Sequence, residues 1–132
     1  MKYQFNNTLE KVGLPLIVAS SKPNLCFLID TGATHNVIFS FVLESIKDSV
    51  SFVESSNTIM GIEGNPTDVP QIEMSLDFQD NQSTSTFSIL VANNAISKIQ
   101  SESGIQIHGI LGIPFLTQNE WILDFKQLTI SN

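Results

Sequence analysis

Short apolar stretches, each bounded by turn-forming residues, recur along the whole chain. Residues 72–78 alternate strictly between apolar and polar side chains, which is typical of a strand with one buried face. Residues 25–29 are apolar throughout, and such a run predicts a strand that is covered on both faces. Taken in order, the pattern predicts strands at 14–19, 25–29, 36–39, 50–53, 72–78, 86–91, 121–123 and 127–130, with a hairpin over 58–69.

Helices are expected to be few and short. A helix is predicted after residue 40, where the Ser40 hydroxyl can cap its start. Pro114 suits the first turn of a second helix that runs through Gln118. The polar stretch 93–104 is expected to contain a helical turn. The predicted class is therefore all-β with one or two short helices.

The length and composition of the chain fit one domain that spans residues 1–132. A chain of 132 residues can bury about two-thirds of its unfolded surface, so it needs no second copy merely to form a core. Hydrophobic residues make up 42% and charged residues 14% of the chain, as in globular proteins. Many of the remaining residues are Thr and Ser, which with Val, Ile and Phe favour strands.

The charge of the chain argues against two classes of partner. Its formal net charge is −7, and all six basic residues are Lys. Nucleic-acid binding relies on Arg forks and basic patches, so it is not expected. An acidic surface is also repelled by anionic lipid headgroups. The expected partner is a peptide or a small molecule.

The single cysteine and the N-terminal sequence bear on the cellular compartment. Cys26 is the only cysteine, which excludes an intrachain disulfide and fits a reducing compartment such as the cytoplasm. Residues 1–11 lack an apolar signal-peptide core, and no apolar run is long enough to span a bilayer. A trimmed leader or membrane anchor stays open as an alternative.

The most informative stretch for chemistry begins where the apolar run 25–29 ends. Asp30 follows the run at once, and Thr31, Gly32 and Ala33 come after it. A buried strand thus delivers a carboxylate into a tight turn. Gly32 permits a close approach of other backbone, and Ala33 leaves space that a larger side chain would fill.

Three motifs together resemble those of one protein family. The Asp-Thr-Gly-Ala sequence 30–33, the Gly-rich stretch 60–64 and the apolar-apolar-Gly sequence 110–112 occur in the order and spacing of retropepsin-like aspartic proteases. The resemblance covers about residues 15–130. It implies the acid-protease fold, with closed β-barrel-like sheets, a flap hairpin and the Gly112 segment behind the catalytic loop. Thr34 and Ile113 replace an Asp and an Arg of retroviral members, so the chain is more similar to retrotransposon, cellular or bacterial members.

The resemblance also implies an activity and a homodimer. Aspartic proteases need two carboxyls on one water, and this chain has a single Asp-Thr-Gly. Two copies are therefore expected to contribute one catalytic Asp30 each to a peptide-hydrolysing site without metal or cofactor. The C-terminal strand 128–130 is expected to pair with its mate in the second copy.

The other motif residues receive roles only from the resemblance. Thr31 and Gly32 complete the catalytic loop, Thr31 as a brace across the dimer axis and Gly32 as the point of entry for substrate backbone. The flap hairpin is expected to close over bound peptide. The expected substrate-binding residues are Ala33, Thr34, Met60, Gly61, Ile62 and Ile110.

A rival interpretation keeps the fold without the activity, as a peptide-binding or assembly module that turns over little or no substrate. Several other polar residues are interpreted as structural. His35 in the turn is expected to be solvated, and His108 to satisfy backbone groups. Glu63 is expected to be an exposed loop acid, and Asp124 to stabilise a hairpin corner because no Thr-Gly follows it.

Overall fold

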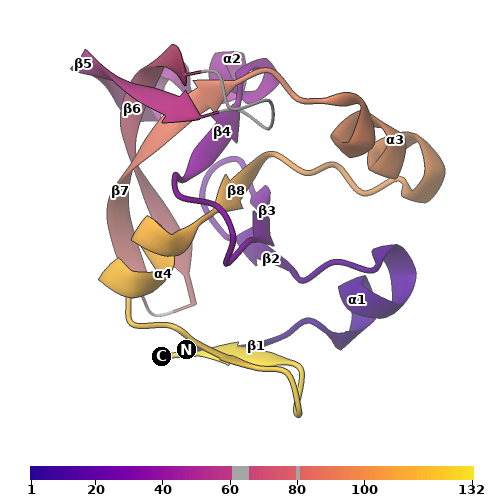
Figure 1. Ribbon diagram of the computed structural model, residues 1–132. Helices are drawn as coiled ribbons and strands as arrows, with labels where there is room; N and C mark the ends of the chain where they lie inside the picture. The colour runs from indigo at the N-terminus through magenta and orange to yellow at the C-terminus, as the bar shows by residue number, and fades with distance from the viewer. Residues whose placement is uncertain (61–65, 80) are drawn as a thin grey trace.

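The computed structural model describes residues 1–60, 66–79 and 81–132, and their strands form two sheets (Figure 1). The smaller sheet has the strand order β1 (Lys2–Gln4), β10 (Thr129–Ser131) and β9 (Ile122–Asp124). The larger sheet has seven strands, in the order β2 (Leu16–Ala19), β3 (Leu25–Ile29), β8 (Gly109–Leu111), β4 (Val37–Phe39), β7 (Asn81–Leu90), β6 (Pro66–Phe78) and β5 (Val50–Met60).

The helices are short and connect the strands. They are α1 (Asn6–Val12), η1 (Ser40–Val42), α2 (Leu43–Ile46), η2 (Lys47–Ser49), α3 (Asn94–Ser103) and α4 (Ile113–Gln118). The prediction of a mostly β chain is therefore confirmed. In the part of the chain that the structure describes, none of the helices has the length and apolar character needed to cross a bilayer.

The expected closed, barrel-like sheets are not found among the described residues. The seven-stranded sheet is open, with β2 at one edge and β5 at the other. Beyond the end of β2, the Ser20 amide donates to the Asp77 carbonyl at 2.8 Å, and the Asp77 amide donates to Ser21 Oγ at 3.1 Å. These bonds join the end of β2 to β6 at one point. The sheet stays open because β2 is only four residues long and builds no ladder with β6.

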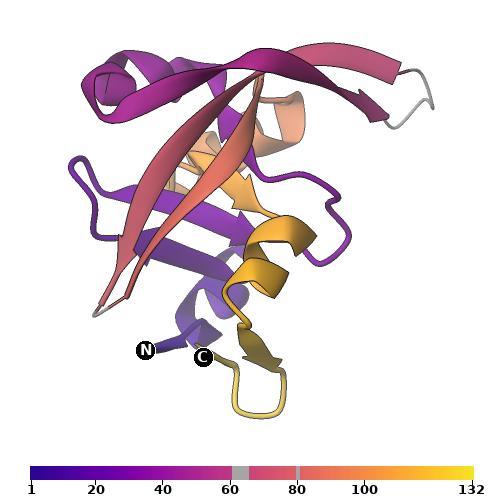
Figure 2. The same ribbon diagram turned by 90° about the vertical axis from the view of Figure 1, so that its left-hand side faces the viewer.

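The long strand β6 is shared by two neighbours (Figure 2). Its first part pairs antiparallel with β5, up to the pair Met60 and Pro66, and its later part pairs antiparallel with β7. The predicted hairpin over 58–69 is thus confirmed for the strands. The expected flap tip falls on residues 61–65, so Gly61, Ile62 and Glu63 lie outside the described residues.

One face of the larger sheet packs on an aromatic core. The inward positions of β6 are Ile72, Met74, Leu76 and Phe78, which confirms the alternation predicted for 72–78. Phe78 contacts Phe115 of α4 and Trp121 edge to face, with ring centroids 5.9 Å and 5.0 Å apart. Other strands also contribute aromatic and apolar side chains to this core, among them Phe27, Ile38, Phe87 and Ile130.

The opposite face of β3 is also covered, as the apolar run 25–29 predicts. Leu25, Phe27 and Ile29 point into the aromatic core, whereas Cys26 and Leu28 pack on a second apolar cluster. Residues of α1, α3 and the segment 105–107 contribute to that cluster. Both helices lie on the same side of the molecule (Figure 1).

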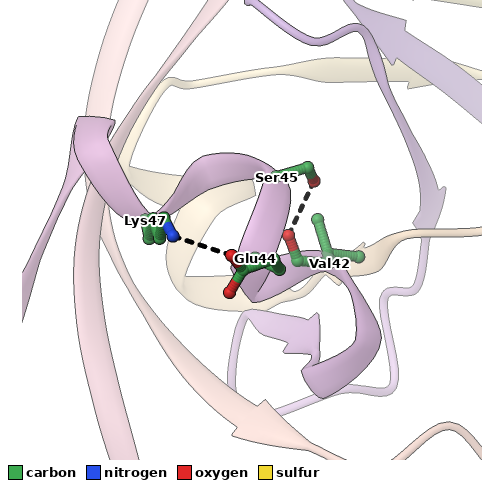
Figure 3. A network of polar contacts seen from close by, with 4 residues as sticks. All are labelled: Val42, Glu44, Ser45 and Lys47. Carbon is green, nitrogen blue, oxygen red and sulfur yellow. Dashed lines mark hydrogen bonds and ion pairs between the residues drawn. The ribbon is translucent and has the colours of Figure 1, made fainter.

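The helical segment after β4 differs in detail from the prediction. It consists of η1, α2 and η2 in succession, and the Ser40 side chain makes no capping bond. Ser45 Oγ instead donates to the Val42 carbonyl at 2.7 Å, and Lys47 pairs with Glu44 at 2.7 Å (Figure 3). This ion pair is mostly exposed, so it contributes little to stability.

One helix is longer than predicted, and another was not predicted at all. Residues 93–104 form the complete helix α3 rather than a single turn, because the Asn93 side chain accepts from the Ile96 amide and Gly104 ends the helix at positive φ. The helix α1 was not predicted from the sequence, although Gly13 ends it in the same left-handed conformation. Gly13 is the signal that indicates its end.

The C-terminal strand, which was expected to pair with its mate in a second copy, is paired on both sides within the chain. β10 is the middle strand of the small sheet and pairs with β1 on one side and β9 on the other. Both of its edges are therefore occupied within the chain. The N-terminal ammonium of Met1 also donates to the Asn132 side chain at 3.1 Å, which joins the two ends of the chain.

We expect Phe115→Ala to lower the free energy of unfolding by about 3–5 kcal/mol, because Phe115 is fully buried between three other aromatic rings. Urea denaturation followed by tryptophan fluorescence measures this. Phe52→Ala is the matched control, since its ring is 65% exposed and its loss is expected to cost little. Equal losses in the two variants would contradict this description of the core.

Candidate functional site

The candidate site is built where β8 lies between β3 and β4. β3 and β4 come directly before and after the Asp30 loop in sequence, yet they do not pair with each other. β8 runs parallel to β3, with Ile29 opposite Leu111, and antiparallel to β4, with Val37 opposite Ile110. The loop of residues 30–36 therefore has to pass over the C-terminal end of β8.

Backbone bonds hold the loop onto the chain that follows β8. The Asp30 amide donates to the Leu111 carbonyl at 3.1 Å, and the Ile113 amide donates to the Ala33 carbonyl at 2.9 Å. A Cβ atom at Gly112 would lie 2.6 Å from the His35 carbonyl oxygen and 2.8 Å from that of Ala33. Gly112 therefore allows the two segments to approach as closely as they do (Figure 2).

The Asp30 carboxylate has one oxygen engaged in its own turn. Asp30 Oδ1 accepts from the Gly32 amide at 2.9 Å, and the Ala33 amide donates to the Asp30 carbonyl at 3.2 Å. The side chain is half-buried. Within residues 1–60, 66–79 and 81–132, its second oxygen has no hydrogen bond and is not completely buried.

The other expected site residues separate into two groups. Thr31, Gly32 and Thr34 are exposed around Asp30, and Ala33 is half-buried beside them. Ile110 is half-buried on β8, where it packs against the second apolar cluster. Thr34 Oγ1 lies 3.0 Å from His35 Nδ1, so His35 has a partner within the loop.

The expected flap residues lie at or beyond the limit of the described residues. Met60 is the last residue of β5, while Gly61 and Ile62 lie outside the described residues. The structure thus joins the Asp30 loop to Leu111 and Ile113, which are far apart from it in sequence, while Ile110 packs on the second apolar cluster.

Asn36 is the residue of this region that sequence reasoning missed. Its side chain is almost completely buried, and Oδ1 accepts from the amides of Gly112 and Phe115, both at 3.1 Å. Nδ2 donates to the Thr86 carbonyl at 3.2 Å. An Asn directly before an apolar strand is a weak signal, and nothing in the local sequence indicates these distant partners.

The cysteine and the second histidine form a structural pair. The Cys26 amide donates to His108 Nδ1 at 2.8 Å, so this imidazole satisfies a backbone group as predicted. Burial raises the pKa of the Cys26 thiol to about 11, and a thiol with this pKa is almost entirely protonated at neutral pH. Cys26 is therefore unsuited to act as a nucleophile.

An open cavity of about 390 Å³ lies elsewhere, between α1 and α3. It is lined by Lys11, Val12, Ile99, Glu102 and Ser103. None of these residues belongs to the Asp30 loop or to β8. Among the described residues, no three His, Cys, Asp or Glu side chains are grouped so that they could hold a metal ion.

Comparison with known proteins adds no name to this arrangement. No protein-family model matches the chain, and no curated protein has a significantly similar sequence. The resemblance to retropepsin-like proteases therefore stays a prediction that rests on the three motifs.

The His108 pair predicts a pH dependence of stability. Burial lowers the pKa of His108, and Nδ1 can accept from Cys26 only while it carries no proton. The folded state therefore favours the neutral imidazole more than the unfolded state does. This contribution is complete above the ordinary histidine pKa of about 6.5 and is lost as the pH falls below it.

Urea denaturation of the wild type and of His108→Gln from neutral to mildly acidic pH measures the effect. We expect the free energy of unfolding of the wild type to fall more steeply on acidification than that of the variant, which has no imidazole at this position. Identical slopes for the two proteins would show that His108 does not titrate differently in the folded and unfolded states.

Proposed function

We propose that the chain is an aspartic endopeptidase of the retropepsin type, which hydrolyses peptide bonds with the Asp30 carboxyls of two copies. One observation carries the proposal. The Asp-Thr-Gly turn is held on the Ile110–Gly112 segment by the bonds from the Asp30 amide to Leu111 and from the Ile113 amide to Ala33. Two motifs that are 80 residues apart thus support one carboxylate whose second oxygen is not completely buried.

The arrangement of the sheet supports an acid-protease fold for this chain. In our proposal, β3, the Asp30 loop and β4 form the catalytic half-site, and β8 inserted between them is the segment that lies behind the catalytic loop. The hairpin of β5 and β6 is the flap. Met60, Gly61 and Ile62 then belong to the part of the flap that contacts substrate backbone.

The proposed reaction requires two carboxyls that share one proton. Two carboxylates a few ångströms apart cannot both ionise easily, so one of them retains a proton. The ionised Asp30 removes a proton from water, whose oxygen attacks the peptide carbonyl carbon, while the protonated Asp30 donates to the carbonyl oxygen. The carboxyl that took the proton from water then gives it to the amide nitrogen, while the other carboxylate takes a proton from a hydroxyl of the tetrahedral intermediate. The C–N bond breaks, and the products are an acid and an amine.

The second carboxyl is proposed to come from a second copy because the sequence contains a single Asp-Thr-Gly motif. Asp124 also ends a strand, but its Oδ1 accepts from the amides of Lys126 and Gln127 at a hairpin corner. Since both edges of β10 are occupied, the small sheet can extend into a second copy only at the outer edge of β1 or of β9. A twofold dimer places each loop opposite its mate.

The remaining residues of the loop take supporting roles in this proposal. Thr31 is exposed next to Asp30 and braces the loop across the dimer axis. Gly32 gives substrate backbone access to the carboxyls. Ala33 and Ile110 line the subsites, and Thr34 stands at the position where retroviral members have a charged residue.

Cleavage of an unstructured protein such as casein, from acidic to neutral pH and at several enzyme concentrations, tests the proposal. We expect Asp30→Asn to lower the rate roughly 10³-fold or more, because Asn keeps the shape of the side chain but cannot transfer a proton. We also expect the wild-type rate to rise more steeply than linearly with concentration near the dimer dissociation constant.

Asp124→Asn is the matched control, since Asp124 also follows an apolar strand and also accepts from the amide two residues later. It is expected to cleave as the wild type does. If wild type, Asp30→Asn and Asp124→Asn are equally inactive while casein still binds, the activity is refuted and the peptide-binding module replaces it. Cleavage that is equal in all three proteins would indicate a contaminating protease.

A further inference from the structure

We propose that Asn36 is the positioning residue that fixes the Asp30 loop for catalysis. The inference rests on the proposed function for its kinetic test, and it has a second test that does not require activity. Asn36 touches no reacting atom in this proposal. It acts on Asp30 through the strand-to-helix junction that follows β8.

The Asn36 side chain caps the start of α4. Gly112 occupies the N-cap position and has no side chain with which to accept from the helix amides. Asn36 Oδ1 supplies the missing acceptor, since it bonds the amides of Gly112 and Phe115 at 3.1 Å each. A residue that is distant in sequence thus caps α4 in place of the local one.

Asn36 is itself held in place by two hydrogen bonds to β7. Its Nδ2 donates to the Thr86 carbonyl at 3.2 Å, and its own carbonyl accepts from the Ser88 amide at 2.8 Å. Both partners belong to β7, a ten-residue strand that lies inside the larger sheet. Asn36 is therefore tied to an inner strand of the larger sheet on one side and to the start of α4 on the other.

The start of α4 is in turn linked to the loop that carries the Asp30 carboxylate. The Ile113 amide, next to the capped Gly112, donates to the Ala33 carbonyl, and Gly112 packs directly on the backbone of Ala33 and His35. The loop from Asp30 to Asn36, the Asn36 side chain and the Gly112–Ile113 segment thus form a closed ring of covalent and hydrogen bonds. Any shift of Gly112 displaces the turn in which Gly32 donates to Asp30.

An ordinary buried asparagine would stabilise α4 and do no more. The two roles differ in what they predict for the loop. A merely structural Asn36 affects global stability, whereas a positioning Asn36 affects kcat more than KM and affects the protection of the loop amides. Small displacements of reacting groups cost about 10²-fold in rate.

Three variants separate these roles. Asn36→Ala removes both acceptor bonds and the donor bond. Asn36→Asp keeps the acceptor at the start of α4, where negative charge is favourable, and replaces the bond to the Thr86 carbonyl with a contact between two oxygens. Gln118→Ala is the matched control, because Gln118 bonds Ser85 and Thr84 of β7 from the opposite end of α4.

In casein cleavage we expect kcat to fall about 10²-fold in Asn36→Ala, with KM within about twofold of the wild type, and most of the loss to be recovered in Asn36→Asp. Gln118→Ala is expected to keep the wild-type kcat. A wild-type kcat in Asn36→Ala, or an equal loss in Gln118→Ala, would overturn the positioning role.

Amide hydrogen exchange followed by NMR gives the second test. We expect Asn36→Ala to speed exchange at Gly32, Gly112 and Ile113 by at least about tenfold relative to Gln118→Ala, in conditions where both variants remain folded. Unchanged protection at Gly32 and Ile113 would refute the inference. If the wild type shows no Asp30-dependent cleavage, the proposed function fails, and the exchange data alone decide whether Asn36 fixes the loop.

Discussion

The insertion of β8 between β3 and β4 is the constraint on which the rest of the structure depends. A central strand that passes this close to its neighbours has room only for glycine at two points. A Cβ atom at Gly109 would lie 2.3 Å from the Val37 carbonyl oxygen and 2.8 Å from the Phe27 ring, and one at Gly112 would meet the loop backbone. The two glycines thus set the distance between the loop and β8, and with it the position of Asp30.

The local elements of the fold could be predicted because their signals lie within a few residues. The antiparallel pair of β2 and β3, the helix α4 that begins near Pro114 and the final hairpin of β9 and β10 follow from apolar runs, turn residues and proline placement. Asp30 could be singled out for the same reason, since an apolar run ends on it.

The non-local features could not be predicted in this way. The bonds of Asn36 to Gly112 and Phe115 join residues that are 76 and 79 positions apart. The periodicity of apolar and polar residues indicates only local structure and cannot predict such a contact. The same holds for β1, which has only three residues and exists as a strand because β10 lies beside it. Strand 128–130 was expected to pair with its mate in a second copy, and the sequence did not indicate that β1, from the opposite end of the sequence, pairs with it within the chain.

The position of β10 between β1 and β9 also sets an order of events in folding. β9 and β10 are joined by a short turn and can pair as soon as that segment exists, whereas β1 pairs with residues 129–131 across nearly the whole chain. Closing so long a loop is costly before other contacts have brought its ends together. β1 therefore pairs with β10 only after the other contacts of the fold have brought these two segments together.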